Sequence, residues 1–460
     1  MSKSNYMDRS AYFRIIDNPD VGNFLADCEY LTEPSDEQIN QIRQEFTLFD
    51  GNGLDRLPEN IIAIDSDMYE SSVRKELPYT NVGYVKVASC LLKKSKYVSM
   101  SGSNFIDPFN IAKITKDKEE VFAVLPCSNM SYKGQASARD SFRLALEDFF
   151  AKVISKSGEL EYSLRDTLFW LSSYRENGEK NKIKLFKCPT CEHLDVEVLN
   201  MEEKQFCIYC GAPIYATDCL RIYEAVQEEG ISNRGALGRL RVVLKHIYFA
   251  HLLRNIKESN RESFLGIIEN IAFIINGTLS IAGQPAWISS SIMKILNEIN
   301  VELLKKNKPQ LLVLGLPEEG NVRNFAEMIQ SHIDCKSLMC VSDDFRNMYI
   351  DFNRDPSSTT FGAETYYGQD FIYKSQKGKI FVFDLPYPFP NKNNKELFKY
   401  EKSRIENYIE MLNPAIQLID EFDCDLQDGK IVPIVLSERY TSISLEPGTT
   451  VLDILSKMNI

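Results

Sequence analysis

The stretch Ile61-Ile62-Ala63-Ile64-Asp65-Ser66-Asp67 decides the fold, because it is an apolar run that stops at an acidic residue. A second run of the same kind, Ile271-Ala272-Phe273-Ile274-Ile275-Asn276-Gly277-Thr278, stops at an amide. Such runs are typical of buried central strands, and an acid at the carboxyl end of a strand is well placed to bind a metal ion. The sequence therefore predicts a sheet edge where Asp65 supplies a carboxylate and Asn276 supplies none.

The composition is that of a globular protein with no broad affinity for anions. Of the 460 residues, 44% are apolar, and the net charge of -12 argues against a surface that attracts phosphate everywhere. No apolar run reaches the roughly 18 residues needed to cross a membrane, and no signal peptide is visible, so we expect a cytoplasmic protein without a membrane partner. Short basic clusters, each also explained as a solvated surface, occur at Lys93-Lys94-Lys96, Arg234-Arg239-Arg241-Lys245 and Lys305-Lys306-Lys308.

The most specific motif is a pair of Cys-x-x-Cys knuckles. Cys188 and Cys191 are separated by fifteen residues from Cys207 and Cys210, and Gly211 suits the tight turn that follows. This spacing predicts a zinc ribbon in which four thiolates hold one structural Zn²⁺. Such a site has no open coordination position, so it predicts a role in folding and not in catalysis.

The hydrophobic pattern predicts alternating helices and strands. A helix is expected over Asp218 to Glu228, a longer one over Arg234 to Lys257, and a hairpin from Gln369–Ser375 and Lys379–Leu385. Further toward the end of the chain we expect a helix over Lys395–Leu412, a strand over Ile431–Leu436 and a helix over Val451–Met458.

Taken together in order and spacing, several stretches resemble the NurA family of nucleases, which partner the hexameric HerA ATPase in DNA end resection and in some bacterial anti-phage systems. They are Ile61–Glu70 with Asn81–Tyr84, Asp218–Arg221, Ile271–Trp287, Thr365–Lys374 and Ser437–Leu445. The resemblance implies an α/β fold with an RNase H-like mixed sheet flanked by helices, into which the zinc ribbon is inserted. It implies a helical lead-in over residues 1–58, a first part of the main domain over 59–183, the ribbon over 184–215 and a second part over 216–460.

For mechanism, the resemblance implies hydrolysis of DNA by Mn²⁺ or Mg²⁺ held between carboxylates. Asp65 matches the first acidic position and is followed by Ser66 and Asp67 where the family has Gly-Ser. Asn276 matches the second acidic position, and Lys245 matches a helical glutamate. Where the family has a late histidine, this chain has Glu438, and its last histidine is His332.

Other candidate residues have ordinary structural explanations. Tyr367 resembles a family position, but a tyrosine on a half-buried strand needs no function. His246 and His251 are five residues apart on the expected helix, so packing or surface roles are expected for them. The acids from which a site could be rebuilt are Asp67, Glu70, Asp343, Asp344 and Glu438, while Glu318 and Glu319 would repel DNA phosphate.

The leading hypothesis is a NurA-like subunit with an eroded catalytic centre that works with a HerA-like ATPase on DNA. The resemblance also implies a homodimer or a pairing with a related, active nuclease. One alternative is an active Mn²⁺-dependent DNase that uses Asp65. A further alternative is a zinc-ribbon DNA adaptor without an ATPase partner.

Overall fold

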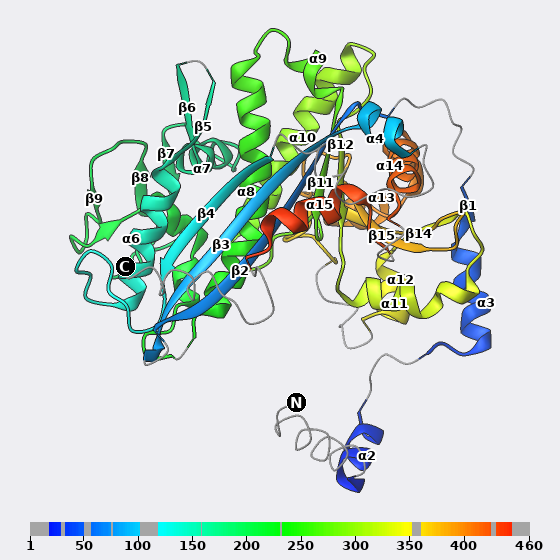
Figure 1. The fold of residues 1–460 in the computed structure, drawn as a ribbon, viewed down its shortest axis with the longest axis horizontal. Coiled ribbons are helices and arrows are strands. Elements are labelled where there is room, and N and C mark those ends of the chain that lie inside the picture. Colours follow the sequence, from blue (N-terminus) through cyan, green and yellow to red (C-terminus); the bar gives the residue numbers. More distant parts are fainter. Residues whose placement is uncertain are drawn as a thin grey trace.

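The computed structural model describes residues 18–28, 33–49, 57–74, 77–101, 118–157, 159–230, 232–351, 360–424 and 429–443. Within them, one mixed sheet runs through the molecule (Figure 1) and consists of β1 (Thr47–Leu48), β2 (Asn60–Arg74), β3 (Leu77–Lys93), β4 (Lys118–Pro126), β11 (Ile271–Asn276), β12 (Leu312–Leu316), β13 (Ser337–Cys340), β14 (Gly368–Lys374) and β15 (Ile380–Pro386). Across the sheet the strand order is β1-β13-β14-β15-β12-β11-β2-β3-β4.

The part of the sheet from β4 to β12 has RNase H-like strand directions, as predicted. The three consecutive strands β2, β3 and β4 are antiparallel neighbours. Strand β11 then pairs with β2 in parallel, and β12 pairs with β11 in parallel. Parallel strands are covered on both faces, which is why β11 and β12 read as nearly continuous apolar runs.

Two helices cover opposite faces of β2. The Ser66 hydroxyl donates to the Arg241 carbonyl of α8 (Arg234–Ser259) at 3.2 Å. The preceding residue, Asp65, points to the other face, where it accepts a hydrogen bond from Thr441 of α15 (Val432–Thr441). Because successive strand residues alternate between faces, this pattern places α8 and α15 on the two sides of β2 (Figure 1).

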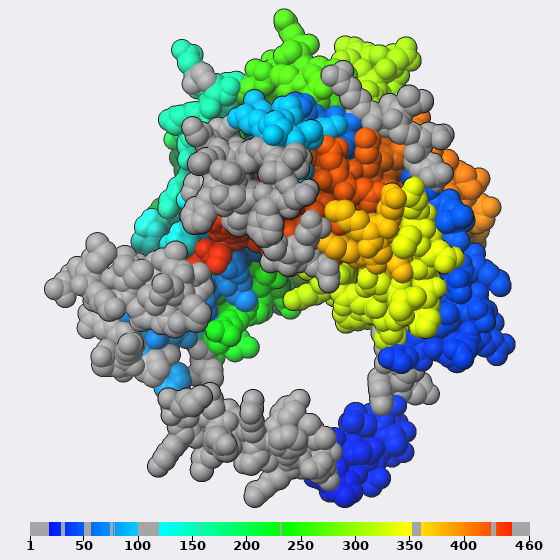
Figure 2. Space-filling view, turned by 45° about the vertical axis from the view of Figure 1, so that its right-hand side comes forward, coloured from blue at the N-terminus to red at the C-terminus, as the bar shows by residue number. Residues whose placement is uncertain are grey.

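The other described α-helices surround the sheet, except for the first. They are α2 (Pro19–Ala26), α3 (Asp36–Glu45), α4 (Lys94–Ser101), α6 (Ala138–Ala151), α7 (Leu164–Ser173), α9 (Phe264–Ile268), α10 (Trp287–Lys305), α11 (Asn321–Ile329), α12 (Asp343–Tyr349), α13 (Lys395–Glu401) and α14 (Ile409–Phe422). Helices α3, α11 and α12 share a second apolar core with β13, β14 and β15. Helix α2 has no buried residue and stands apart from the sheet (Figures 1 and 2). No described helix is both long and apolar enough to cross a membrane.

The cysteine module lies between α7 and the short 3-10 helix η1 (Ala216–Leu220). It is built from two small antiparallel ladders, in which β7 (Lys182–Lys184) pairs with β8 (Glu197–Leu199) and β9 (Gln205–Phe206) pairs with β10 (Pro213–Ile214). A separate hairpin of β5 (Val153–Ser157) and β6 (Leu160–Ser163) joins α6 to α7. The ribbon is therefore an insertion between segments that both contribute strands to the main sheet. The predicted domain boundaries stay a prediction.

Three of the predicted elements were wrong in type or extent. The expected helix over Asp218–Glu228 is two 3-10 helices, η1 and η2 (Ile222–Ala225), separated by Arg221 with a positive φ of 54°. The expected helix over Lys395–Leu412 is divided into α13, the 3-10 helix η5 (Ile405–Tyr408) and α14.

The third error concerns the expected strand over Ile431–Leu436, which is the start of helix α15. Its β-branched residues favour a strand by composition, but Pro433 sits in the first helical turn, where no backbone N–H is required. Glu438 therefore projects from a helix and not from a strand end. The expected helix over Val451–Met458 lies outside the described residues.

Candidate functional site

Asp65 and Asn276 lie side by side at the end of β11. The parallel register pairs Ile64 of β2 with Ile275 of β11, so the next residue of each strand is Asp65 and Asn276. Asn276 is also in register with Leu316, the last residue of β12. The chain after β12 therefore brings Glu318 to the same edge, as the arrangement of parallel strands requires.

Lys245 occupies this edge with a positive charge. Its ammonium group, which comes from α8, donates to the backbone carbonyl of Asn276. Burial lowers the pKa of Lys245 to about 8, while the nearby Asp65 carboxylate opposes that shift. Gly277 follows with φ of 115°, and a Cβ there would lie 3.1 Å from the Lys245 Nζ, so both backbone conformation and space favour glycine.

Both acids on this stretch of β2 are held by the end of α15 and the residues after it. Asp65, which is buried, accepts from the Thr441 hydroxyl at 2.5 Å. Asp67 accepts from the backbone N–H of Ile443 at 3.4 Å and from that of Met68 at 2.8 Å. Each carboxylate thus has a hydrogen-bond donor from the protein itself.

A second lysine joins the two glutamates of the site. Lys430 lies 2.5 Å from Glu438 Oε1 and 2.9 Å from Glu318 Oε1. The Asn276 side-chain amide donates to Glu438 at 3.3 Å. Burial and a hydrogen bond to Glu318 raise the pKa of Glu438 to about 7. Burial alone would raise the pKa of Glu318 as well, but hydrogen bonds from Glu438 and Lys430 keep it below its usual value.

The structure thus places Asp65, Asn276, Lys245 and Glu438 together at one sheet edge. Sequence reasoning missed Lys430 and Thr441, and the only effect that it assigned to Glu318 was repulsion of DNA phosphate. The position of Glu318 could have been found, because it follows β12 by two residues and parallel strands end at a common edge. Lys430 carried no signal of its own, because nothing in the sequence indicated that a lysine would pair with the candidate Glu438 and with Glu318 together.

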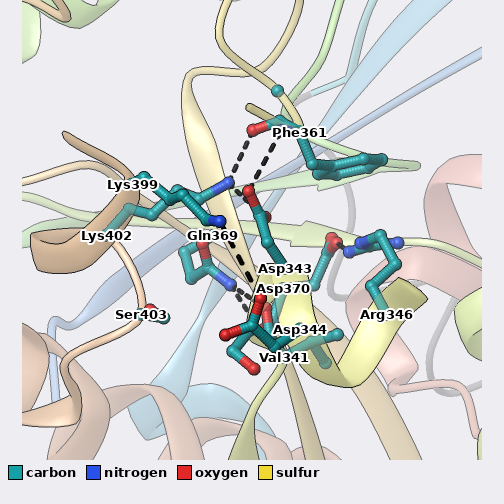
Figure 3. A network of polar contacts seen from close by, with 12 residues as sticks. Val341, Asp343, Asp344, Arg346, Phe361, Gln369, Asp370, Lys399, Lys402 and Ser403 are labelled. Carbon is teal, nitrogen blue, oxygen red and sulfur yellow. Dashed lines mark hydrogen bonds and ion pairs between the residues drawn. The ribbon is translucent and has the colours of Figure 1, made fainter. Parts of the chain in front are cut away.

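The other candidate acids have structural roles away from this edge. Glu70 accepts from the Ser232 hydroxyl and from the backbone N–H of Asn233 at 2.8 Å. Asp343 accepts from Lys402 at 2.6 Å and from the Phe361 N–H at 3.2 Å (Figure 3). The Asp344 side chain is 86% exposed and faces Lys399 at 3.8 Å. These acids therefore do not add to the charge around Asp65.

Tyr367 and the two helical histidines belong to the core. The Tyr367 hydroxyl lies 2.8 Å from His246 Nδ1, and both side chains are fully buried. His251 lies 2.9 Å from the Thr167 hydroxyl and is buried as well. Burial lowers the pKa of each histidine to about 3, so both are neutral at physiological pH. Packing, one of the two roles expected from their spacing, is the one they have.

The four cysteines form a site with the geometry of structural zinc. Their sulfur atoms all lie within 4.8 Å of one another, and the Cys188–Cys210 and Cys191–Cys207 sulfur pairs are 3.8 Å apart. A tetrahedron with Zn–S bonds of about 2.3 Å has edges of about 3.8 Å, so the donor set fits Zn²⁺. Backbone hydrogen bonds at 2.8 Å from Cys188 to His193 and from Cys207 to Ala212 close the two knuckles.

The chemistry available at the two sites differs. Within the described parts of the chain, no other set of three histidine, cysteine or carboxylate ligand atoms gathers as closely as the four thiols. At the sheet edge, the Lys245 ammonium group is bound to the Asn276 carbonyl, and Lys430 bridges Glu318 and Glu438. The carboxylates at that edge are paired with donors and cations of the protein itself.

Comparison with known proteins gives a distant structural likeness. No protein-family model matches the sequence, and no match is found among curated proteins. Among solved structures, the chain is similar to the crystal structure of the NurA nuclease from Sulfolobus solfataricus, at 9% sequence identity and a TM-score of 0.34, over 100% of this chain and 96% of that chain. What this chain does is therefore inferred from its own residues.

Replacing Cys207, a buried cysteine of the four-cysteine cluster, should make the protein lose its zinc ion. Purified protein should contain about one Zn²⁺ per chain, and Cys207→Ser should release it and lower the midpoint of thermal unfolding, because structural zinc contributes directly to folding. Elemental analysis and calorimetry measure the two effects. Cys335→Ser, an exposed cysteine outside the cluster, is the control and should change neither. Full zinc retention in Cys207→Ser would contradict the assignment.

The raised pKa of Glu438 predicts a pH dependence of stability. The folded-state pKa of Glu438 is about 7 and its ordinary value is 4.5, so the folded state binds more protons than the unfolded state between these pH values. The free energy of unfolding contributed by this group therefore falls as pH rises through that window. Compared with Glu438→Gln, the wild type should lose about 1–3 kcal/mol between pH 4.5 and pH 7, measured by urea denaturation. The control is Glu319→Gln, at the exposed residue that follows Glu318, and its stability should change with pH as that of the wild type does.

Proposed function

We propose that this chain is a NurA-like DNA-processing subunit whose nuclease centre no longer holds a catalytic metal ion. In this proposal it assembles with a HerA-type hexameric ATPase, as a homodimer or together with a related active nuclease, in DNA end processing or anti-phage defence. The RNase H-like sheet and the resemblance of the motifs along β2, β11 and α15 support the DNA-processing part. The partners come from that resemblance alone.

The observation that carries the proposal is the Lys245 ammonium group, which is bound to the Asn276 carbonyl and interacts electrostatically with Asp65. A catalytic Mn²⁺ or Mg²⁺ needs several carboxylate oxygens that are free to ligate it. Here the carbonyl of Asn276 is bound to Lys245, and the Asp65 carboxylate accepts from Thr441. Two unit charges about 4 Å apart interact with about 4 kcal/mol at an effective dielectric of about 20. Replacing a carboxylate by a lysine therefore makes the interaction energy with each unit of positive charge on a metal ion less favourable by about twice that amount.

The amide of Asn276 is used as a donor and not as a ligand. Its side-chain nitrogen donates to Glu438, which an aspartate at this position could not do. Lys430 completes the neutralisation, since it pairs with Glu438 and Glu318 together. Asn276, Lys245 and Lys430 therefore act as one set of replacements, in which two internal cations stand where a metal-dependent nuclease holds divalent ions.

One observation favours the alternative of an active Mn²⁺-dependent DNase. Asp65, Glu318 and Glu438 share one sheet edge, and the pKa of Lys245 is lowered to about 8 by burial, so the ammonium group can lose its proton at mildly alkaline pH. A zinc-ribbon DNA adaptor without an ATPase is the third reading. Co-purification with a hexameric ATPase encoded beside the chain would distinguish the proposed subunit from that adaptor.

Cleavage assays separate the inactive from the active reading. Purified protein incubated with single-stranded and double-stranded DNA and Mn²⁺ should give no cleavage above that of Asp65→Ala. The comparison is made at pH 7 and again above the pKa of Lys245. Cleavage by the wild type that disappears in Asp65→Ala would contradict the proposed inactive centre and show that the chain is an active DNase.

Restoring the two lost charges should restore metal binding. The double variant Lys245→Glu with Asn276→Asp removes the internal cation and supplies two carboxylates next to Asp65. We expect it to bind Mn²⁺ at least about tenfold more tightly than the wild type, measured by isothermal titration calorimetry on zinc-loaded protein. Lys306→Glu with Asn307→Asp makes the same change of charge at exposed positions and should bind as the wild type does. Equal Mn²⁺ affinity of both double variants would argue against the assignment of the centre.

A further inference from the structure

Helix α8 carries exposed arginines that no part of the described chain neutralises. Arg234, Arg239 and Arg241 are all exposed, and none of the three side chains has a carboxylate partner within the described residues. On a helix of 3.6 residues per turn, Arg234 and Arg241 lie on one face with Lys245. Arg239 lies about 140° around the helix from Arg234, on the other side of the exposed face. On a chain with a net charge of -12, three unpaired guanidinium groups on one helix are an exception to the general charge.

Three acids that lie close to the start of α8 in space or in sequence are already engaged. Glu70 accepts from Ser232 and Asn233 at the start of α8. Glu224 is paired with Arg221 at 2.7 Å, and Glu228 accepts from the first two backbone N–H groups of α6 at 2.8 and 3.1 Å. The three arginines therefore remain available to an anion from outside the chain.

A largely aliphatic pocket lies beside the arginines. It has a volume of about 440 Å³, within the usual range for small-ligand sites. Its walls come from three segments: Leu220 and Ile222 of η1 and η2, Gly238 and Val242 of α8, and Ala282 to Pro285 after β11. The charged side chains that line it are Arg221, Glu224 and Arg239. The Arg221 guanidinium donates to the Gln284 side chain at 2.5 Å and so joins two of these walls.

The pocket and the Asn276 edge are built from the same two segments. Gly238, Val242 and Lys245 follow one another at helical spacing on α8, about 10 Å from the first to the last. The chain from Asn276 to Pro285 supplies the other side of both sites. That chain is fixed by backbone hydrogen bonds from Gly277 to Leu316 at 2.9 Å and from Ile281 to Thr365 at 2.9 Å, so the pocket is preformed.

Gly238 keeps the pocket open. A glycine inside a helix is less favourable than alanine by roughly 0.5–1 kcal/mol. A Cβ at Gly238 would meet no atom within 4 Å, so packing does not demand glycine here. What the glycine provides is space next to Arg239 and Val242.

We propose that this surface binds single-stranded nucleic acid, with phosphates on Arg234, Arg239 and Arg241 and one unpaired base in the pocket at Gly238. Guanidinium groups bind phosphate, and a flat base fits an aliphatic slot with an arginine at its rim. A base inside a duplex is stacked on its neighbours and cannot enter, so the pocket selects single strands. This inference rests on the proposed DNA-processing function and adds the form of nucleic acid that the subunit holds.

Filling the pocket with a side chain tests whether a base binds there. Because the space in front of Gly238 is empty, Gly238→Leu should fold and should occupy the pocket. In fluorescence anisotropy with a labelled oligothymidylate, it should weaken binding about tenfold or more. Gly235→Leu is the matched control, since Gly235 also has open space around it on the same helix but does not line the pocket. Equal binding by Gly238→Leu and the wild type overturns the proposal, as does an absence of binding by the wild type.

Removing the arginines tests the phosphate contacts. The salt dependence is measured as the slope of log affinity against log salt concentration. In the triple variant Arg234→Ala, Arg239→Ala, Arg241→Ala, this slope should be less steep by about two, because each phosphate contact on a single strand contributes about 0.7. Lys96→Ala, Lys305→Ala, Lys306→Ala removes the same charge elsewhere and should keep the wild-type slope. Equal slopes in the two triple variants, or binding of heparin without binding of the oligonucleotide, overturn the proposal. These readouts are binding constants, so their failure is distinct from the appearance of Mn²⁺-dependent cleavage, which overturns the proposed inactive centre.

Discussion

The contact between the Lys245 ammonium group and the Asn276 carbonyl determines what the carboxyl edge of this sheet can hold. It depends on Gly277, whose positive φ and missing side chain leave room for the lysine. It also depends on the parallel register that puts Asp65 next to Asn276. The buried cation held there interacts electrostatically with the Asp65 carboxylate, and we propose that it takes the place of a divalent ion.

The other carboxylates at this sheet edge are also paired with groups of the protein. A lone buried carboxylate is costly, so each acid requires a donor or a cation. Asp65 has Thr441 and the nearby Lys245, and the two glutamates share Lys430 and one another. The charges that an active centre would leave open for metal are closed here by residues from α8 and from the segment around α15. By contrast, the arginines at the start of α8 are left open, which is why we place the contact with nucleic acid on that helix.

The sequence predicted the parts of the structure that depend on local pattern. The strand Ile271–Asn276, the hairpin of β14 and β15 and the four-cysteine cluster follow from apolar runs, turn residues and spacing. Helix α15 was missed because Ile431–Leu436 has strand-like composition, while its helical state is favoured by packing against β2 and by Pro433 in its first turn. Thr441 and Lys430 could not be predicted as site residues, because their relation to Asp65 and Glu318 exists only after the chain has folded; Thr441 and Asp65 are 376 positions apart.

The most direct test of the central claim is a crystal structure of the zinc-loaded protein soaked in MnCl₂, with anomalous scattering measured at the manganese and zinc edges. We predict a zinc signal between Cys188, Cys191, Cys207 and Cys210. We also predict no manganese signal within ligand distance of Asp65, with the Lys245 ammonium group in place against the Asn276 carbonyl. A manganese ion bound to Asp65, with Lys245 displaced, would contradict the claim that an internal cation has replaced the metal.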